Sequence, residues 1–232
     1  MNEPAEAIRY AANAFLAARI SFINAITNMC EAVGADVADV IQGMGYDRRI
    51  GFDALQPGPG WGGSCLPKDT CALLRICDDA GYDFGLLRAV IAANEEQQDR
   101  VVAKIAAAAG GPLAGVTVAV WGLTFKAGTD DRRHSPAVAI VRQLARAGAR
   151  VRAYDPTVRR SLPGIDVCPE PYRACQGASV LAVLTEWEEL RCLDFQKARS
   201  LMASPCVVDV RNLLDPVAMR WAGFRYEGMG RS

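Results

Sequence analysis

The sequence predicts an α/β protein with an all-helical domain over residues 1–110 and a Rossmann-like domain with a parallel sheet over residues 111–232. Two observations indicate this division. Long runs of apolar residues at helical spacing fill the first half, whereas short β-branched runs alternate with helical patterns in the second. The breaker segment Gly110–Pro112 separates them. At roughly 100–200 residues per domain, a chain of 232 residues accommodates two.

Helical patterns cover most of residues 5–109. The first runs from Ala5 to Val33 without an internal proline or glycine, a length typical of a packing spine or a subunit contact. Shorter helices are predicted over residues 37–44, 69–80 and 86–109. Gly45–Pro67 contains too many glycines and prolines for a helix or a strand.

The second half predicts a parallel α/β layer structure. Strands are expected over residues 116–120, 150–154, 180–184 and 206–210, and an amphipathic helix over residues 136–147. Short strands that alternate with helices favour a parallel sheet with helices on its faces.

The composition excludes several classes of function. The 26 basic and 26 acidic side chains give a net charge of zero, so we expect no nucleic-acid or membrane partner. No apolar run reaches the ~18–20 residues that cross a bilayer, and Met1–Pro4 does not resemble a signal peptide, which favours a cytoplasmic location. The eight cysteines include no C-x-x-C pair and His134 is the single histidine, so no metal site is predicted. Seven of the cysteines are expected to be buried.

The segment Gly62–Asp69 is the first candidate for chemistry. Its two glycines allow the backbone to approach a ligand closely. Cys65 directly precedes a predicted helix and lies near Lys68, and both features favour the thiolate form of a cysteine. Asp69 is placed to cap that helix. From these residues alone, a structural cysteine beside a capped helix is about as well supported as a nucleophile.

The turn after the first predicted strand is the second candidate. A dinucleotide-binding turn would read G-x-G-x-x-G at that place, but Gly122–Gly128 does not, although Asp155 at the end of the next strand could hold a ribose. We therefore expect a mononucleotide site at the carboxyl ends of the strands rather than NAD bound by this domain alone.

Six segments in the same order resemble the UDP-glucose/GDP-mannose dehydrogenase family, and the resemblance extends from residue 5 to the end of the chain. The segment Gly62–Asp69 resembles the active-site signature of the nucleotide-sugar 6-dehydrogenases. Arg-Ile-Gly followed by the Gly58–Cys65 motif is most similar to the UDP-glucose enzymes, whereas Leu66 also occurs in the GDP-mannose enzymes, which leaves GDP-mannose as an alternative. The other matching segments are Glu6–Ala17, Asp47–Gly51, Gly122–Lys126, Thr129–Pro136 and Asp209–Asn212.

The resemblance implies an NAD-dependent, two-step oxidation of UDP-glucose to UDP-glucuronate. Cys65 matches the nucleophile that holds the aldehyde as a thiohemiacetal and then as a thioester. Asp69 matches the carboxylate that positions the hydrolytic water, and Asn13 matches an amide that stabilises the oxyanion. Arg9 stands where the family has a lysine, one helical turn before Asn13.

The resemblance also implies binding residues and a homodimer through the 5–33 helix. Arg49, matched to an arginine that can reach the neighbouring subunit's site, is one of the residues expected at the nucleotide sugar. The other residues expected there are Leu55, Gly58, Gly60, Phe125, Lys126 and Arg211. Lys68 and Arg133 match cofactor contacts.

Two departures from the family pattern bear on activity. The family's first ~200 residues, which carry the NAD-binding domain, have no counterpart here, so the chain is expected to be inactive unless such a domain precedes it or is a separate chain. Arginine at position 9 keeps the positive charge of lysine but cannot exchange a proton near neutral pH. The alternative function is a non-catalytic UDP-sugar-binding or dimerisation module.

Overall fold

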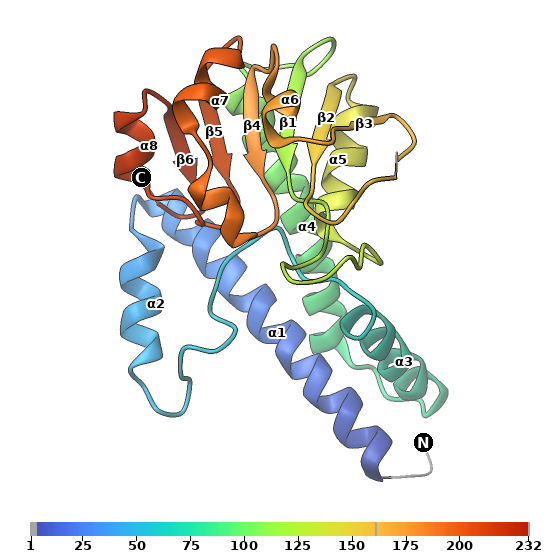
Figure 1. Cartoon of the computed structure of the whole chain (residues 1–232). Coiled ribbons are helices and arrows are strands. Elements are labelled where there is room, and N and C mark those ends of the chain that lie inside the picture. Colours follow the sequence, from blue (N-terminus) through green and yellow to red (C-terminus); the bar gives the residue numbers. More distant parts are fainter. Residues whose placement is uncertain (1–3, 161, 232) are drawn as a thin grey trace.

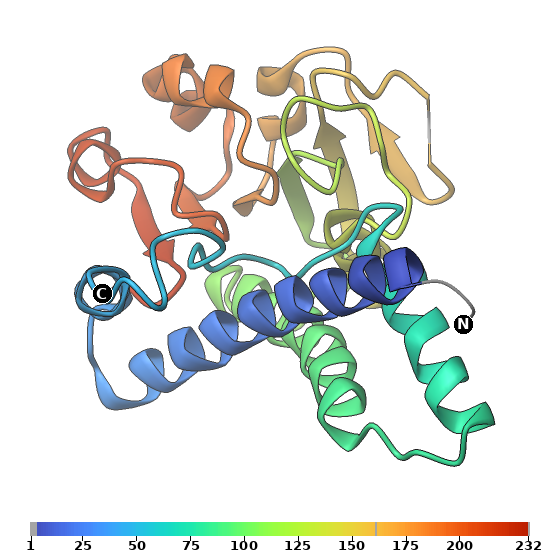
Figure 2. The ribbon, with the colours of Figure 1, turned by 90° about the horizontal axis from the view of Figure 1, so that it is seen from below.

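A layer of helices lies beneath a six-stranded sheet in the computed structural model, which describes residues 4–160 and 162–231 (Figure 1). Helix α1 runs obliquely under the sheet, and α3 and α4 pack against it (Figure 2). None of the described helices is both long and apolar enough to cross a membrane. The helices of this layer are α1 (Pro4–Val33), α2 (Val37–Gly45), α3 (Leu66–Asp79) and α4 (Gly85–Ala108).

The sheet is parallel throughout and has the order β3-β2-β1-β4-β5-β6. This is the doubly wound order, in which the loops after β1 and β4 diverge at the carboxyl edge and leave a crevice for a ligand. The predicted fold class is confirmed. The strands are β1 (Thr117–Trp121), β2 (Arg150–Tyr154), β3 (Ile165–Val167), β4 (Val180–Val183), β5 (Cys206–Asp209) and β6 (Arg225–Gly228).

Alternate residues of the strands face two separate apolar cores, as the two-residue period of a strand requires. Helices α4 and α5 cover one face, and the shorter helices α6, α7 and α8 cover the other. The elements not yet given are α5 (Pro136–Arg146), α6 (Pro171–Cys175), the 3-10 helix η1 (Glu188–Cys192), α7 (Phe195–Leu201) and α8 (Pro216–Trp221).

Helix α4 belongs to both halves of the molecule. Leu87 and Val90 in its first turns pack with α1, while Val101, Ile105 and Ala108 are buried in the core under the sheet. The apolar core of the α/β half therefore begins inside α4. The domain boundary near residue 110 stays a prediction. A single continuous helix thus couples the position of the helical layer to that of the sheet.

Several local expectations were wrong. Helix α3 begins at Leu66 with Cys65 as its N-cap, so Asp69 lies inside the helix and does not cap it. The reason is Pro67, whose missing N–H costs nothing in the first turn of a helix. Cys71 and Cys192 are exposed and Cys77 is half-buried, because they lie on outer faces of their helices. The short strands β3 and β6 were missed.

Buried amide side chains hold the glycine-rich loop between α1 and α4. Asn94 accepts a hydrogen bond from the Trp61 N–H at 2.7 Å and donates one to the Trp61 carbonyl at 3.2 Å. Asn24 accepts from the Gly58 N–H at 2.9 Å, and Gln97 donates to the Gly58 carbonyl at 2.9 Å. Two helices thus satisfy the backbone of a buried loop that has no strand or helix of its own.

We expect Asn94→Ala to lower the free energy of unfolding by about 2 kcal/mol, because it leaves the N–H and carbonyl of Trp61 buried without partners. Asn28→Ala is the matched control, since the Asn28 amide is half-exposed and bonds only to the side chain of Gln97 among the described residues. Urea unfolding followed by circular dichroism measures both. Equal losses in the two variants would contradict the role assigned to Asn94.

Candidate active site

Cys65 lies at the start of α3 with its side chain exposed. The Asp69 N–H donates to the Cys65 carbonyl at 2.9 Å, and the Ser64 hydroxyl is 3.7 Å from the Cys65 Sγ. The first N–H groups of a helix have no partners within the helix and favour negative charge nearby. The position therefore suits an accessible sulfur nucleophile.

A buried carboxylate lies one turn from this thiol. Asp69 is only 2% exposed, and its Oδ2 accepts a hydrogen bond from Asn13 Nδ2 at 2.6 Å. Arg9 Nε is 3.5 Å from the same oxygen, and Lys68 Nζ is 3.8 Å from Oδ1. Among the described residues, Asp69 Oδ1 has no hydrogen-bond partner. The structure thus gathers four of the predicted residues around one buried carboxylate.

The glycines before Cys65 are required by close packing. A Cβ on Gly62 would overlap the His134 carbonyl, and one on Gly63 would come within 2.9 Å of the Phe125 ring. The Gly63 N–H also donates to the Arg133 carbonyl at 3.1 Å. This contact joins the cysteine loop to the long turn that follows β1.

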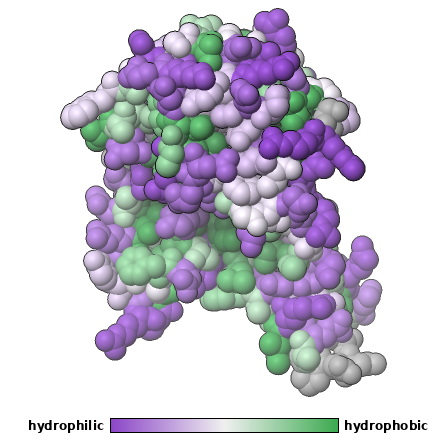
Figure 3. Space-filling view, in the orientation of Figure 1, coloured by the Kyte–Doolittle hydropathy of each residue, from purple (hydrophilic) through white to green (hydrophobic). Residues whose placement is uncertain are grey.

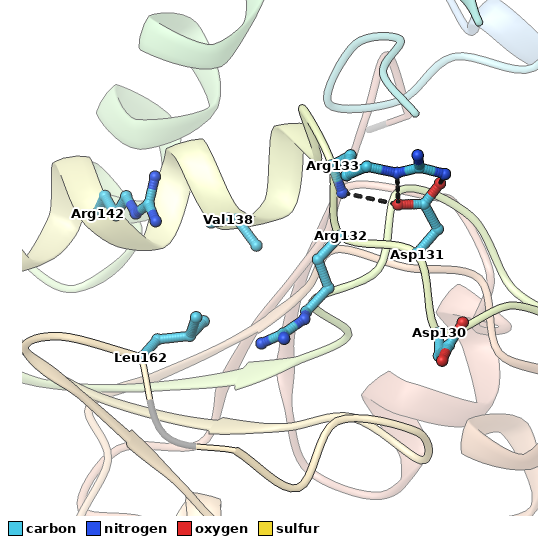
Figure 4. A pocket seen from close by; sticks show the side chains of 7 residues that line it. All are labelled: Asp130, Asp131, Arg132, Arg133, Val138, Arg142 and Leu162. Carbon is cyan, nitrogen blue, oxygen red and sulfur yellow. Dashed lines mark hydrogen bonds and ion pairs between the residues drawn. The ribbon is translucent and has the colours of Figure 1, made fainter. Parts of the chain in front are cut away.

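Arg133 extends from that turn beside the cysteine loop. It forms a two-pronged pair with Asp131, from Nε at 3.0 Å and Nη2 at 2.9 Å, which Figure 4 shows next to a shallow cavity of about 490 Å³. The ion pair lowers the pKa of Asp131 and raises the pKa of Arg133. The nearby Cys65 sulfur makes a smaller contribution to the rise at Arg133. Arg132 points away from this pair, toward Leu162 (Figure 4).

Arg211 joins the loops after β1, β4 and β5. Its Nε donates to the Leu184 carbonyl at 3.0 Å and its Nη2 to the Phe125 carbonyl at 2.9 Å. A Cβ on Gly58 would lie 3.0 Å from the third guanidinium nitrogen, so only glycine leaves that nitrogen room. Burial lowers the pKa of Arg211, whereas Glu186 and Asp209 oppose the shift.

Lys126 completes this second cluster. Its Nζ lies 5.5 Å from the centre of the Phe125 ring, and its side chain is exposed. The structure therefore brings Gly58, Phe125, Lys126 and Arg211 together at the carboxyl edge of the sheet. Gly60 lies two residues after Gly58. It has a φ of 119° and packs against the Asn94 side chain.

Arg49 and Leu55 lie elsewhere. The Arg49 side chain is 88% exposed and pairs with Asp47, with Nη2 2.6 Å from Oδ2. Both residues line a cavity of about 300 Å³ on the outer side of α1, together with Phe15 and Phe22. Arg49 and Leu55, both expected at the nucleotide sugar, thus line one cavity beside α1.

The α/β half does not fit a dinucleotide. Asp155 is fully buried, and its Oδ2 accepts from the N–H groups of Leu123 at 2.7 Å and Thr124 at 3.1 Å, while Thr157 bonds to its Oδ1. Both carboxylate oxygens of Asp155 therefore have partners within the chain. Gly58–Gly63 matches G-x-G-x-x-G in letters, but it follows α2 and an irregular loop instead of a strand.

Two acidic residues at strand ends were missed by the sequence reasoning. Asp209 accepts from the N–H groups of Arg211 at 3.1 Å and Leu214 at 2.7 Å, and burial raises its pKa. Glu186 contacts Ala127 and Arg211. The available signal was an acidic residue at or just after the ends of β2, β4 and β5.

Comparison with known proteins agrees with this geometry. Residues 3–96 match the central domain of the UDP-glucose/GDP-mannose dehydrogenase family, and residues 119–216 match the UDP binding domain of the same family. The chain is 46% identical over 230 residues to a UDP-glucose 6-dehydrogenase of Rhizobium meliloti, covering 97% of this chain and 53% of that protein. A Pseudomonas aeruginosa UDP-glucose 6-dehydrogenase is 44% identical, with coverages of 98% and 52%.

Solved structures show the same likeness. A UDP-glucose dehydrogenase from Pyrobaculum islandicum superposes with a TM-score of 0.84 at 32% identity, over 97% of this chain and 50% of that one. An NDP-N-acetyl-D-galactosaminuronic acid dehydrogenase from Methanosarcina mazei gives a TM-score of 0.88 at 28% identity, over 98% and 51%. The chain spans about half the length of the curated relatives it matches. With both domain models matched in order, the chain belongs to the UDP-glucose/GDP-mannose dehydrogenase family.

Proposed function

We propose that this chain supplies the nucleophile and the UDP-sugar site of an NAD-dependent UDP-glucose 6-dehydrogenase, which oxidises the sugar C6 alcohol to a carboxylate. The observation that carries the proposal is an exposed thiol at a helix start, one turn from the buried Asp69 with its partners Asn13 and Arg9. The family membership and the names of the relatives support it.

The substrate is assigned to the carboxyl edge of the sheet. Lys126 and Arg211 are the two cations there, and cations suit a diphosphate. Gly58 supports this site from below, because its lack of a side chain leaves room for the Arg211 guanidinium. UDP-glucose is proposed over GDP-mannose because the curated relatives named above are UDP-glucose enzymes.

The chemistry is assigned to the cluster around Asp69. The Cys65 sulfur adds to the C6 aldehyde and retains it, so that the intermediate between the two oxidations is not released. The Asn13 amide and Arg9 stabilise negative charge on the C6 oxygen. The free Asp69 Oδ1 holds the water that cleaves the thioester.

The cofactor is assigned outside the described sheet. Lys68 and Arg133, exposed on either side of the cysteine loop, fit contacts with the diphosphate of NAD, which when bound accepts hydride from C6. The sheet itself does not fit the dinucleotide, so the nucleotide-binding loop belongs to a preceding segment or to a separate chain.

A homodimer through α1 is part of the proposal. Phe15 is 64% exposed, and large apolar side chains are exposed along the whole helix. Apolar side chains gather in the lower half of the face in Figure 3, in the region of α1 and α2. A second copy would bury them and would place Arg49, beside Phe15 and Phe22, at the subunit contact. The exposed large apolar residues on α1 are Ile8, Phe15, Leu16, Phe22, Met29 and Val33.

We expect sedimentation velocity at micromolar concentration to show a dimer, and the double variant Phe15→Glu, Phe22→Glu to sediment as a folded monomer. The introduced charges cannot be buried at an apolar contact without a large desolvation cost. Trp221→Glu is the control, because Trp221 is 86% exposed on α8, away from α1. A monomeric unmodified chain would contradict the dimer.

Cys65 is expected to react fastest with limiting iodoacetamide near neutral pH. Cys71 is the internal reference, since it is also exposed and belongs to the same helix, but lies away from the helix start. Position 65 is at the helix N-terminus, where unpaired backbone N–H groups favour a reactive sulfur, and position 71 is not. Peptide mapping by mass spectrometry measures the order, and faster labelling of Cys71 or Cys192 would remove the chemical basis for the nucleophile.

Supplying a family cofactor domain, fused ahead of the chain or as a second chain, is expected to give slow NAD-dependent formation of UDP-glucuronate. Cys65→Ala abolishes this activity and Cys71→Ala does not, because only the first removes the covalent step. Arg9→Lys raises the rate, since a compact ammonium fits against an oxyanion where a planar guanidinium displaces its neighbours.

The same assembly distinguishes the alternative function. A folded complex that binds both ligands but forms no UDP-glucuronate, even with Arg9→Lys, would identify the chain as a non-catalytic UDP-sugar-binding module. A lower rate with Arg9→Lys would show that Arg9, paired with Asp69 and stacked 4.8 Å from the Tyr10 ring centre, is adapted to the site.

A further inference from the structure

The segment that follows β4 packs against the turn that follows β1 and is hydrogen-bonded to it. The Thr185 hydroxyl donates to the Thr124 carbonyl at 2.7 Å, and Gly122 packs so closely on Thr185 that a Cβ there would overlap it. Trp187 Nε1 donates to Asp155 Oδ2 at 3.3 Å, and Asp155 in turn holds the start of the same turn. Glu186 lies between these two contacts.

The Glu186 carboxylate bridges two loops that come from different strands. Its Oε1 accepts from the Ala127 N–H at 3.2 Å, and its Oε2 is 3.0 Å from Arg211 Nε. Ala127 directly follows Phe125 and Lys126 in the turn after β1, whereas Arg211 lies in the loop after β5. Glu186 therefore adds a second link between the turn that carries Lys126 and the Arg211 loop, beside the bond from Arg211 to the Phe125 carbonyl.

We propose that Glu186 is a positioning residue of the nucleotide-sugar site, holding Lys126 and Arg211 in the relative placement that receives a diphosphate. This inference rests on the proposed function for the identity of the ligand. Glu186 makes two different contacts: Oε1 accepts the Ala127 N–H, whereas Oε2 forms an ion pair with Arg211, whose Nε–H donates to the Leu184 carbonyl. Glutamate carries the negative charge that the ion pair needs, whereas glutamine has the same shape and no charge.

The remaining contacts show that Glu186 acts on the site more than on the fold. Asp155 anchors the base of the β1 turn, and Asp209 anchors the backbone of Arg211. The Leu184 and Phe125 carbonyls hold the Arg211 guanidinium independently. The Glu186 side chain is 37% exposed, and pairs this exposed contribute little to stability. Without Glu186 the turn keeps the bond between the Phe125 carbonyl and Arg211, but it loses its anchor at Ala127, the residue after Lys126.

Titration calorimetry of the whole chain with UDP tests the proposal. Glu186→Gln is expected to weaken UDP binding about tenfold, because the ligand must then order the two loops itself. Uridine, which lacks the diphosphate, is expected to bind both proteins alike. Glu188→Gln is the matched control. It removes the same charge from the same segment, but Glu188 pairs with Arg191 and not with Arg211. UDP binding that is unchanged or tighter in Glu186→Gln would overturn the inference.

Two further measurements separate positioning from a general loss of structure. In a Lys126→Ala background, Glu186→Gln is expected to cost much less UDP affinity, because one of the two positioned cations is already gone. Equal costs in both backgrounds would overturn the inference.

Amide hydrogen exchange supplies a readout without ligand. The Ala127 amide is expected to exchange about tenfold faster in Glu186→Ala, which removes its acceptor, while amides in β1 exchange as before. Unchanged exchange at Ala127 would show that Glu186 does not hold this amide. If the unmodified chain binds no UDP, the proposed function fails, and this exchange experiment still decides whether Glu186 holds the turn.

Discussion

The site depends on the hydrogen bonding of one buried loop. Residues 56–63 pass between α1 and α4 with no regular structure, and their backbone groups would be costly to bury without partners. Asn24 from one helix and Asn94 and Gln97 from the other provide those partners. Because Cys65 follows this loop directly, the amide clamp also determines where the thiol and helix α3 begin.

The carboxyl edge of the sheet has a matching arrangement of acids. Asp155, Glu186 and Asp209 each accept backbone N–H groups from a loop at this edge. A Rossmann-like sheet normally directs such edge groups at a dinucleotide, whereas here Asp155 is used internally. The same topology thus presents a different surface, on which Arg211 packs against Gly58 and bonds to the Phe125 carbonyl.

The two clusters are joined by contacts between the halves of the chain. Gly62 packs on the His134 carbonyl, Gly63 bonds to Arg133, and Gly58 leaves room for Arg211. Helix α4, buried in both cores, sets the distance over which these contacts are made. A change in the packing of α4 is therefore expected to affect the thiol and the diphosphate cluster together, although neither contains a residue of that helix.

Much of this molecule was determined by the sequence alone. Periodicity predicted the helical first half and the parallel α/β second half, because apolar spacing reports directly which face of an element is buried. The motif around Cys65 and its resemblance to a family indicated the candidate nucleophile, and the structure then placed Asn13 and Arg9 against Asp69. These features depend on local spacing or on short contiguous segments.

Other features were decided only by the tertiary structure. Asp155 could have met a ribose or its own neighbouring turn, and only the packing of β1 beside β2 brings the N–H groups of Leu123 and Thr124 to its carboxylate. Glu186 bridges two residues that are distant in the sequence. Ala127 lies 59 positions before it, and Arg211 lies 25 positions after it. No local pattern encodes such a contact, because it arises from the order in which the strands assemble in the sheet.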